Sequence, residues 1–393
     1  MKFVREKFLY MFFLLVIMGA VVGLSIQASG LDEVDDFSKP QEYPRAIVLE
    51  VLEEDIEDRD YSGGTINSHA QILKVLILDG DFEGERVVAQ YSLNYGLTDD
   101  YKFEALSKGD RVLLYIEEND AGNIGSAYVT EIVRERYLLY LTLGFVILLL
   151  LIGRTKGVKA IISLVITALA VVRILLPAIL AGWDPVIISV LVGVGVICVS
   201  LIVIGGFTAK TVAAIIGTCG GVIAAGVIAL IIGNLAKLTG LGTDETMMLM
   251  YIPQEVEFNF RGLLFAGIII GAMGATMDVG MSVASAMHEI KEKCPDIKAS
   301  EFIKAGMNVG RDVMATMTNT LILAYAGASL HLMLLLLAYQ TPFTHVVNTD
   351  IIASEILRAI AGSIGIVLVV PLTAIAAAVL GMKGNYGTEE QEQ

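Results

Sequence analysis

Hydrophobic positions along the chain follow two different periods, and the change between them divides the sequence. An apolar run from Phe8 to Ile26 is followed by alternating, strand-like sequence between Tyr43 and Glu135. From Tyr137 to Leu380 the pattern becomes a series of long apolar runs. Runs of this kind cross a bilayer core of roughly 30 Å at about 1.5 Å per residue in a helix. The pattern predicts a polytopic α-helical membrane protein that carries one small β domain.

The strand-like segment contains five short candidate strands separated by turn clusters. They cover residues 46–52, 70–78, 86–92, 111–117 and 127–133. Five short strands in about 90 residues predict a small β-barrel of the OB-like kind. Its acidic loop from Glu53 to Asp60 is open to two interpretations, a cation or ligand site and a solvated rim on a stabilising cap. The rim is favoured, because the loop lacks the glycine and alternating oxygen ligands of a calcium loop.

Eight apolar runs are expected to span the membrane. They are residues 8–26, 137–152, 158–180, 186–207, 212–232, 262–287, 318–337 and 356–380. The first run is either a cleaved signal peptide, which leaves seven spans, or an uncleaved helix, which its length favours. Residues 299–309 are expected to form a short amphipathic helix at the cytoplasmic surface. The expected domains are residues 1–29 (N-terminal helix or signal anchor), 30–136 (acidic β domain), 137–382 (seven helices) and 383–393 (tail).

Composition agrees with this division, since 55% of the residues are hydrophobic and only 18% are charged. The net charge of -15 comes entirely from residues 30–136, which hold 25 acidic and 10 basic residues, while the rest of the chain holds 17 of each. Such an acidic domain excludes a nucleic-acid partner.

Basic residues also predict the topology. Lys156, Lys210, Lys291 and Lys304 lie in alternate loops, and the loops between them are poor in lysine and arginine. Because basic loops stay in the cytoplasm, both termini are expected to be cytoplasmic and residues 30–136 to face outside the cell membrane.

Polar residues at membrane depth supply the candidate chemistry. Asp278 and Ser282 share a helical face with several glycines, and a second stripe on the following segment repeats at helical spacing through Asp312, Thr316 and Asn319. A carboxylate near the bilayer midplane points to an ion, proton or substrate path, and a hydrogen bond that only stabilises packing is the alternative. The two stripes are expected to face each other.

A second group of charged residues is expected in the outer half of the bundle. Arg173 lies beyond the middle of its predicted span, and Glu355 and Arg358 begin the last one. An intramembrane ion pair between Arg173 and Glu355 would lower the cost of burying both charges. Such a pair either only stabilises the bundle or takes part in the function of the protein.

Three segments resemble a known family. The strings GATMDVGMSVASAMHEI, GMNVGRDVMATMTNTLILAYAGASL and ASEILRAIAGSIGIVLVVPLTA are similar to those of the YibE/F family of bacterial multi-pass membrane proteins. The resemblance covers most of the chain and implies its architecture, but it implies no particular activity.

Sequence patterns of common enzymes are absent. The chain has no P-loop, no zincin motif after His288 and no Gly-x-Ser-x-Gly, so we expect neither an enzyme nor a cofactor or metal site. We expect a transporter or permease-like protein for a small solute or ion, in contact with the lipid bilayer. The alternative is a non-transporting scaffold or sensor whose outer β domain binds a partner. A second copy of the chain or a membrane protein remains open as a partner.

Overall fold

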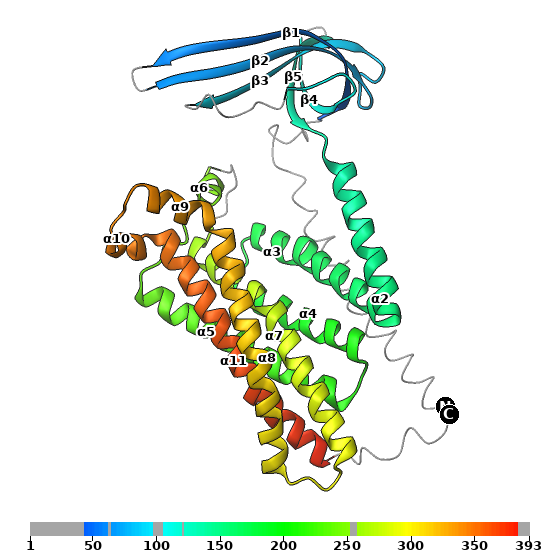
Figure 1. Ribbon diagram of the computed structural model, residues 1–393, viewed down its shortest axis with the longest axis vertical. Coiled ribbons are helices and arrows are strands. Elements are labelled where there is room, and N and C mark those ends of the chain that lie inside the picture. Colours follow the sequence, from blue (N-terminus) through cyan, green and yellow to red (C-terminus); the bar gives the residue numbers. More distant parts are fainter. Residues whose placement is uncertain (1–42, 62–63, 97–104, 120–121, 252–257, 384–393) are drawn as a thin grey trace. The chain divides into compact units, whose positions relative to one another are not determined.

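A computed structural model describes residues 43–61, 64–96, 105–119, 122–251 and 258–383 (Figure 1). The predicted first span at 8–26 and the predicted tail lie outside these residues. The chain divides between Leu148 and Leu149 into two compact units, one built from strands and one from helices.

The β unit is a closed barrel of five strands, as the alternating pattern predicted. The strands are β1 (Arg45–Tyr61), β2 (Gly64–Ile77), β3 (Arg86–Gly96), β4 (Arg111–Glu118) and β5 (Ile124–Ile132). Their order around the barrel is β1-β2-β3-β5-β4, and pairing of β1 with β4 closes it. All pairs are antiparallel except β3 with β5.

The barrel interior is apolar with one polar exception. Val48, Leu73, Val112 and Leu114 are fully buried because alternate side chains of each strand point inward. Gln71 is also buried, and its Oε1 accepts a hydrogen bond of 2.9 Å from the Leu106 N–H. This bond fixes the loop before β4 to the inside of the barrel.

Helices make up the second unit. Its elements, with the helix that leads into it, are α2 (Glu135–Ala170), the π-helical turn η2 (Val171–Leu175), α3 (Leu176–Leu180), α4 (Pro185–Gly205), α5 (Ala209–Leu235), α6 (Asp244–Leu249), α7 (Phe260–Lys293), α8 (Ala299–Ala328), α9 (Leu330–Ala338), α10 (Phe343–Asn348) and α11 (Asp350–Lys383).

Five helical runs in the described part of the chain are long and apolar enough to cross a membrane. The number becomes six if α8 and α9, which meet at a bend of 60°, form one broken span. Two predicted spans, 137–152 and 158–180, belong to one helical run that is interrupted at Arg154, where φ is 47° and ψ is -125°. A side chain at Gly157 would collide with the Leu149 carbonyl, so the chain turns tightly there.

The short surface helix expected at residues 299–309 is wrong, because α8 continues without a break to Ala328. Phe302, Gly306, Gly310 and Leu321 form one buried line along α8. This line packs along its whole length, so the charged residues near its start do not end the helix.

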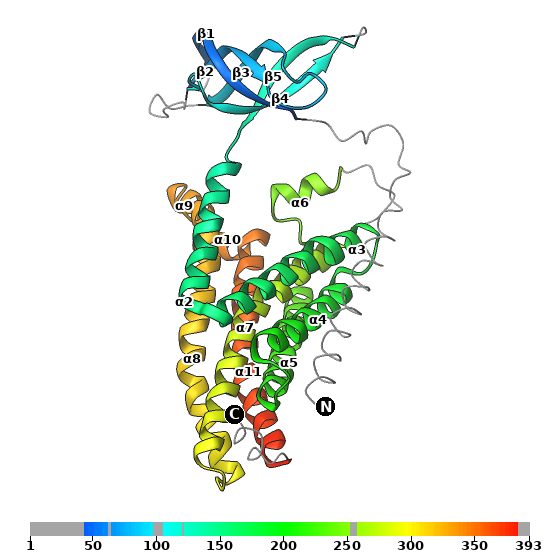
Figure 2. The same cartoon turned by 90° about the vertical axis from the view of Figure 1, so that its right-hand side faces the viewer.

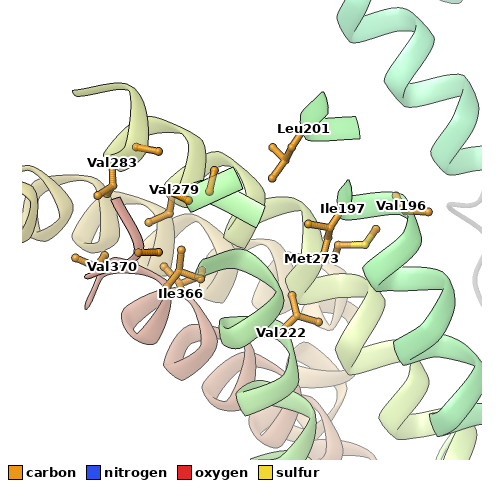
Figure 3. Close-up of a cluster of buried hydrophobic side chains, with 14 of the residues drawn as sticks. Val196, Ile197, Leu201, Val222, Met273, Val279, Val283, Ile366 and Val370 are labelled. Carbon is orange, nitrogen blue, oxygen red and sulfur yellow. The ribbon is translucent and has the colours of Figure 1, made fainter. Parts of the chain in front are cut away.

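Helices α5, α7 and α11 form the centre of the bundle, with α4 and α8 beside them (Figures 1 and 2). Glycines allow close contact between α5 and α11, since Gly217 meets the side chain of Thr373 and Gly221 meets the carbonyl of Gly365. Figure 3 shows buried side chains of the core between these helices, and Ile197, Met273 and Ile366 belong to this one cluster. The bundle interior is therefore filled by side chains.

Candidate functional site

Asp278 lies near the middle of α7 and points away from the bundle core. Its neighbours Thr276, Val279 and Gly280 are buried, whereas Asp278 itself is exposed. Ser282, one turn further along, is exposed on the same face. Among the described residues, Asp278 receives no hydrogen bond and forms no ion pair. The structure thus leaves a carboxylate unpartnered at the middle of an apolar helix.

The polar stripe of α8 is exposed as well. Asp312, Thr316 and Asn319 lie on the side of the helix opposite to the buried Gly306 and Gly310. The Thr316 hydroxyl donates to the carbonyl of Val313 at 2.9 Å. In the part of the chain that is described, the Asn319 amide makes no hydrogen bond.

Two contacts set the register between α7 and α8. Gly271 lies against the phenolic oxygen of Tyr325, and Met287 lies against Gly306. The helices are therefore antiparallel, and counting from both contacts puts Asp278 level with the turn from 316 to 319.

The two polar stripes do not face each other, in contrast to the sequence-based expectation. On α8, the side toward the bundle is lined by glycines, and Gly310 meets Val370 of α11. On α7, the large apolar side chains fill the core. Small and apolar residues thus make the helix contacts, and both polar stripes remain on the surface of the bundle.

The interior of the bundle offers hydroxyl groups but no charge. Every buried polar residue in the described helices is serine or threonine. Thr276 donates to the Met273 carbonyl at 2.8 Å, and its own carbonyl accepts from Thr218 at 3.4 Å. These bonds join α5 to α7. Among the described helices, the carboxylates and basic side chains therefore lie outside the fully buried interior.

Glu355 and Arg358 of α11 form an ion pair, with their side chains 3.0 Å apart. The Arg358 guanidinium also lies over the ring of Tyr325, at 5.8 Å from its centroid. Arg173 is exposed in η2, and it forms no ion pair with Glu355. The expected ion pair between Arg173 and Glu355 is therefore not formed. Glu355 pairs instead with Arg358, which lies one turn away on the same helix.

An open hollow of about 340 Å³ lies where the first turns of α4 and α7 meet the end of α5. Arg261 lines it and is held by hydrogen bonds to the Leu238 carbonyl at 2.7 Å and to Asn234 Oδ1 at 3.0 Å. Asp184 lines it too, with its carboxylate capping α4 through the amides of Val186 and Ile187. None of the predicted path residues borders this hollow.

Comparisons with known proteins bear on the helical part. The model of a family described as YibE/F-like protein matches residues 141–383, which is more than half of the chain. No curated protein and no solved structure matches the sequence. The matched region includes every residue of the two polar stripes.

Proposed function

The chain belongs to the YibE/F-like family, and from this premise and the geometry above we propose that it moves a proton or a small cation across a membrane. Family membership and the apolar helices support a membrane protein. The further step to transport rests on the exposed polar residues of α7 and α8.

One observation carries the proposal, namely that no described residue bonds to the carboxylate of Asp278 near the middle of α7. A charged side chain at this depth is expensive in lipid, and such residues usually mark ion or proton pathways. Carboxylate, hydroxyl and carboxamide oxygens suit protons and hard cations rather than soft metals. We assign Asp278 as the group that binds the transported ion.

The other polar residues extend the path from Asp278. Ser282 lies one turn along α7, and Thr316 and Asn319 are level with Asp278 on α8. Asp312, one turn from Thr316, continues the stripe toward the basic end of α8. Together they provide successive oxygen atoms at the spacing of a helical turn.

The competing function is a scaffold or sensor that transports nothing. In a scaffold, Asp278 would serve packing and would be expected to have a hydrogen-bond partner within the bundle. No described residue of the chain is such a partner, and the transport measurement below separates the two functions. No enzymatic activity is proposed, and the solute beyond its charge class is left to experiment.

Transport is tested with purified protein in liposomes that contain a pH-sensitive dye. A potassium diffusion potential drives proton entry, and parallel runs use a sodium or potassium gradient with a dye that reports the same ion. We expect ion entry above that of empty liposomes, lost in Asp278→Asn and kept in Glu289→Gln. Glu289 is a matched control, since it is an exposed carboxylate near the C-terminal end of the same helix. Equal entry in wild type and Asp278→Asn, or no entry of any tested ion, contradicts the proposal.

A further inference from the structure

Five polar residues of α7 and α8, here called the polar face, are exposed in the described part of a single chain. They are Asp278, Ser282, Asp312, Thr316 and Asn319. Lipid tails offer no hydrogen bonds, so an amide or a carboxylate left against them is unfavourable. Something other than lipid must therefore lie over this face.

The described part of the chain brings no hydrogen-bonding group to Asp278. No described side chain bonds to Asp278 or to the Asn319 amide. The apolar run from Phe8 to Ile26 has no polar side chain between Met11 and Leu24. Such a segment has nothing to donate to a carboxylate at the middle of a span. The covering surface must bring hydrogen-bond donors to the depth of Asp278.

A second copy of this chain has donors at the required depth. In a membrane, a two-fold axis along the bilayer normal keeps every residue of the partner at its own depth. Asp278 is level with the turn that holds Thr316 and Asn319, as the contacts of Gly271 and Gly306 establish. The carboxylate of one copy then meets the free carboxamide of the other, and the same contact recurs across the axis.

The shape of the face also admits a close neighbour. Gly267 and Gly274 are exposed on α7 beside Asp278, and open space lies above both. Glycines at such spacing let the backbone of another helix approach. Small residues on α7 and hydrogen-bonding groups on both helices thus occur at exposed positions of similar depth.

We propose that two copies of this protein associate through the polar face, with α7 of each copy against α8 of its partner, so that Asp278 meets Asn319 across the seam. This association stands on the exposed face alone and does not depend on transport. It goes beyond the proposed function by naming the partner that completes the polar path.

The association is tested by disulfide cross-linking between two differently tagged copies of the full chain in membranes. Both start from a background in which Cys198, Cys219 and Cys294 are replaced. One copy carries Ser282→Cys and the other Thr316→Cys, which keeps Asp278 and Asn319 intact and changes side-chain size little. The control replaces Ser282→Cys with Ile216→Cys, an exposed apolar position of α5 at the same depth as Asp278.

We expect the Ser282→Cys and Thr316→Cys pair to give a cross-linked dimer with a yield several-fold above the control pair. Native mass spectrometry of the wild-type protein should then show a dimer. Equal yields in both pairs together with a monomeric wild type would overturn the proposal and assign the face to a different protein. Neither readout measures ion movement, so failure of association and failure of transport are separate results.

Discussion

The phenolic oxygen of Tyr325 on α8 lies directly over Gly271 on α7. No hydrogen bond of the described residues uses this oxygen, so its position follows from packing. The contact fixes the register between α8 and α7. It therefore also sets the depth of Asp278 relative to Asn319.

A side chain at Gly271 should destabilise the protein. The Cβ of Gly271→Ala would occupy the place of the Tyr325 oxygen. Overpacking destabilises a protein by about 1–3 kcal/mol. The higher helix propensity of alanine offsets up to about 1 kcal/mol of this loss. We expect a net loss of about 1–2 kcal/mol in the free energy of unfolding. Unfolding in detergent, followed by circular dichroism, measures it.

Two further variants test the cause of that loss. Tyr325→Phe removes the oxygen and should restore the stability of Gly271→Ala. Gly195→Ala on α4 meets open space and should be neutral or stabilising. If Gly271→Ala behaves like Gly195→Ala, the contact is not where we place it.

Glu355 and Arg358 should be energetically coupled. Neutralising one partner of this half-buried pair leaves the other charge without its ion, at a cost of about 1–3 kcal/mol. In a double-mutant cycle with Glu355→Gln and Arg358→Gln, we expect a coupling energy of at least about 0.5 kcal/mol. A cycle of Glu355→Gln with Arg173→Gln should be additive. Coupling to Arg173 instead of Arg358 would restore the interpretation made from the sequence.

The β domain should face outside the cell. Because basic residues concentrate in alternate loops, a cysteine at Glu83, which is exposed in the turn between β2 and β3, should react with an impermeant thiol reagent in intact cells. Native Cys294 is exposed just after α7 and provides an internal control that should react only after lysis. The reverse pattern would invert the topology.

Gln71 should hold the loop before β4. Gln71→Leu removes the acceptor of the Leu106 amide inside the barrel, which costs about 1–3 kcal/mol for an unmet buried group. Hydrogen exchange of the full-length protein should show faster exchange around residue 106. Gln90→Leu on the exposed side of β3 is the control and should leave this exchange unchanged.

The barrel was predictable because parts of its strands alternate between buried and less buried residues. On β4, Val112 and Leu114 point inward while Arg111 and Leu113 do not, and this alternation specifies both the strand and its inner face. The ends of β1 and β2 were not predictable, since their hairpin extends beyond the residues that the barrel core needs.

The helical part was predictable in its elements but not in its contacts. Spacing showed that Asp278 and Ser282 share a face, and it could not show which neighbour covers that face. On α8, Lys304, Arg311 and Asp312 lower the hydropathy of the first half, which concealed that the helix is continuous. Matching depths along the predicted spans favour a pair of Glu355 with Arg173. This prediction overlooks Arg358, which lies one turn from Glu355 on the same helix and is its partner in the structure.

Ion transport along the polar residues of α7 and α8 requires that water reaches them within the membrane. Single cysteines at Ser282, Thr316 and Ile216 are introduced separately into the background without native cysteines and treated in membrane vesicles with a small, charged thiol reagent. We expect rapid modification at positions 282 and 316 and none at 216, although all three are exposed in the single chain. Protection of positions 282 and 316 to the same degree as 216 would contradict it.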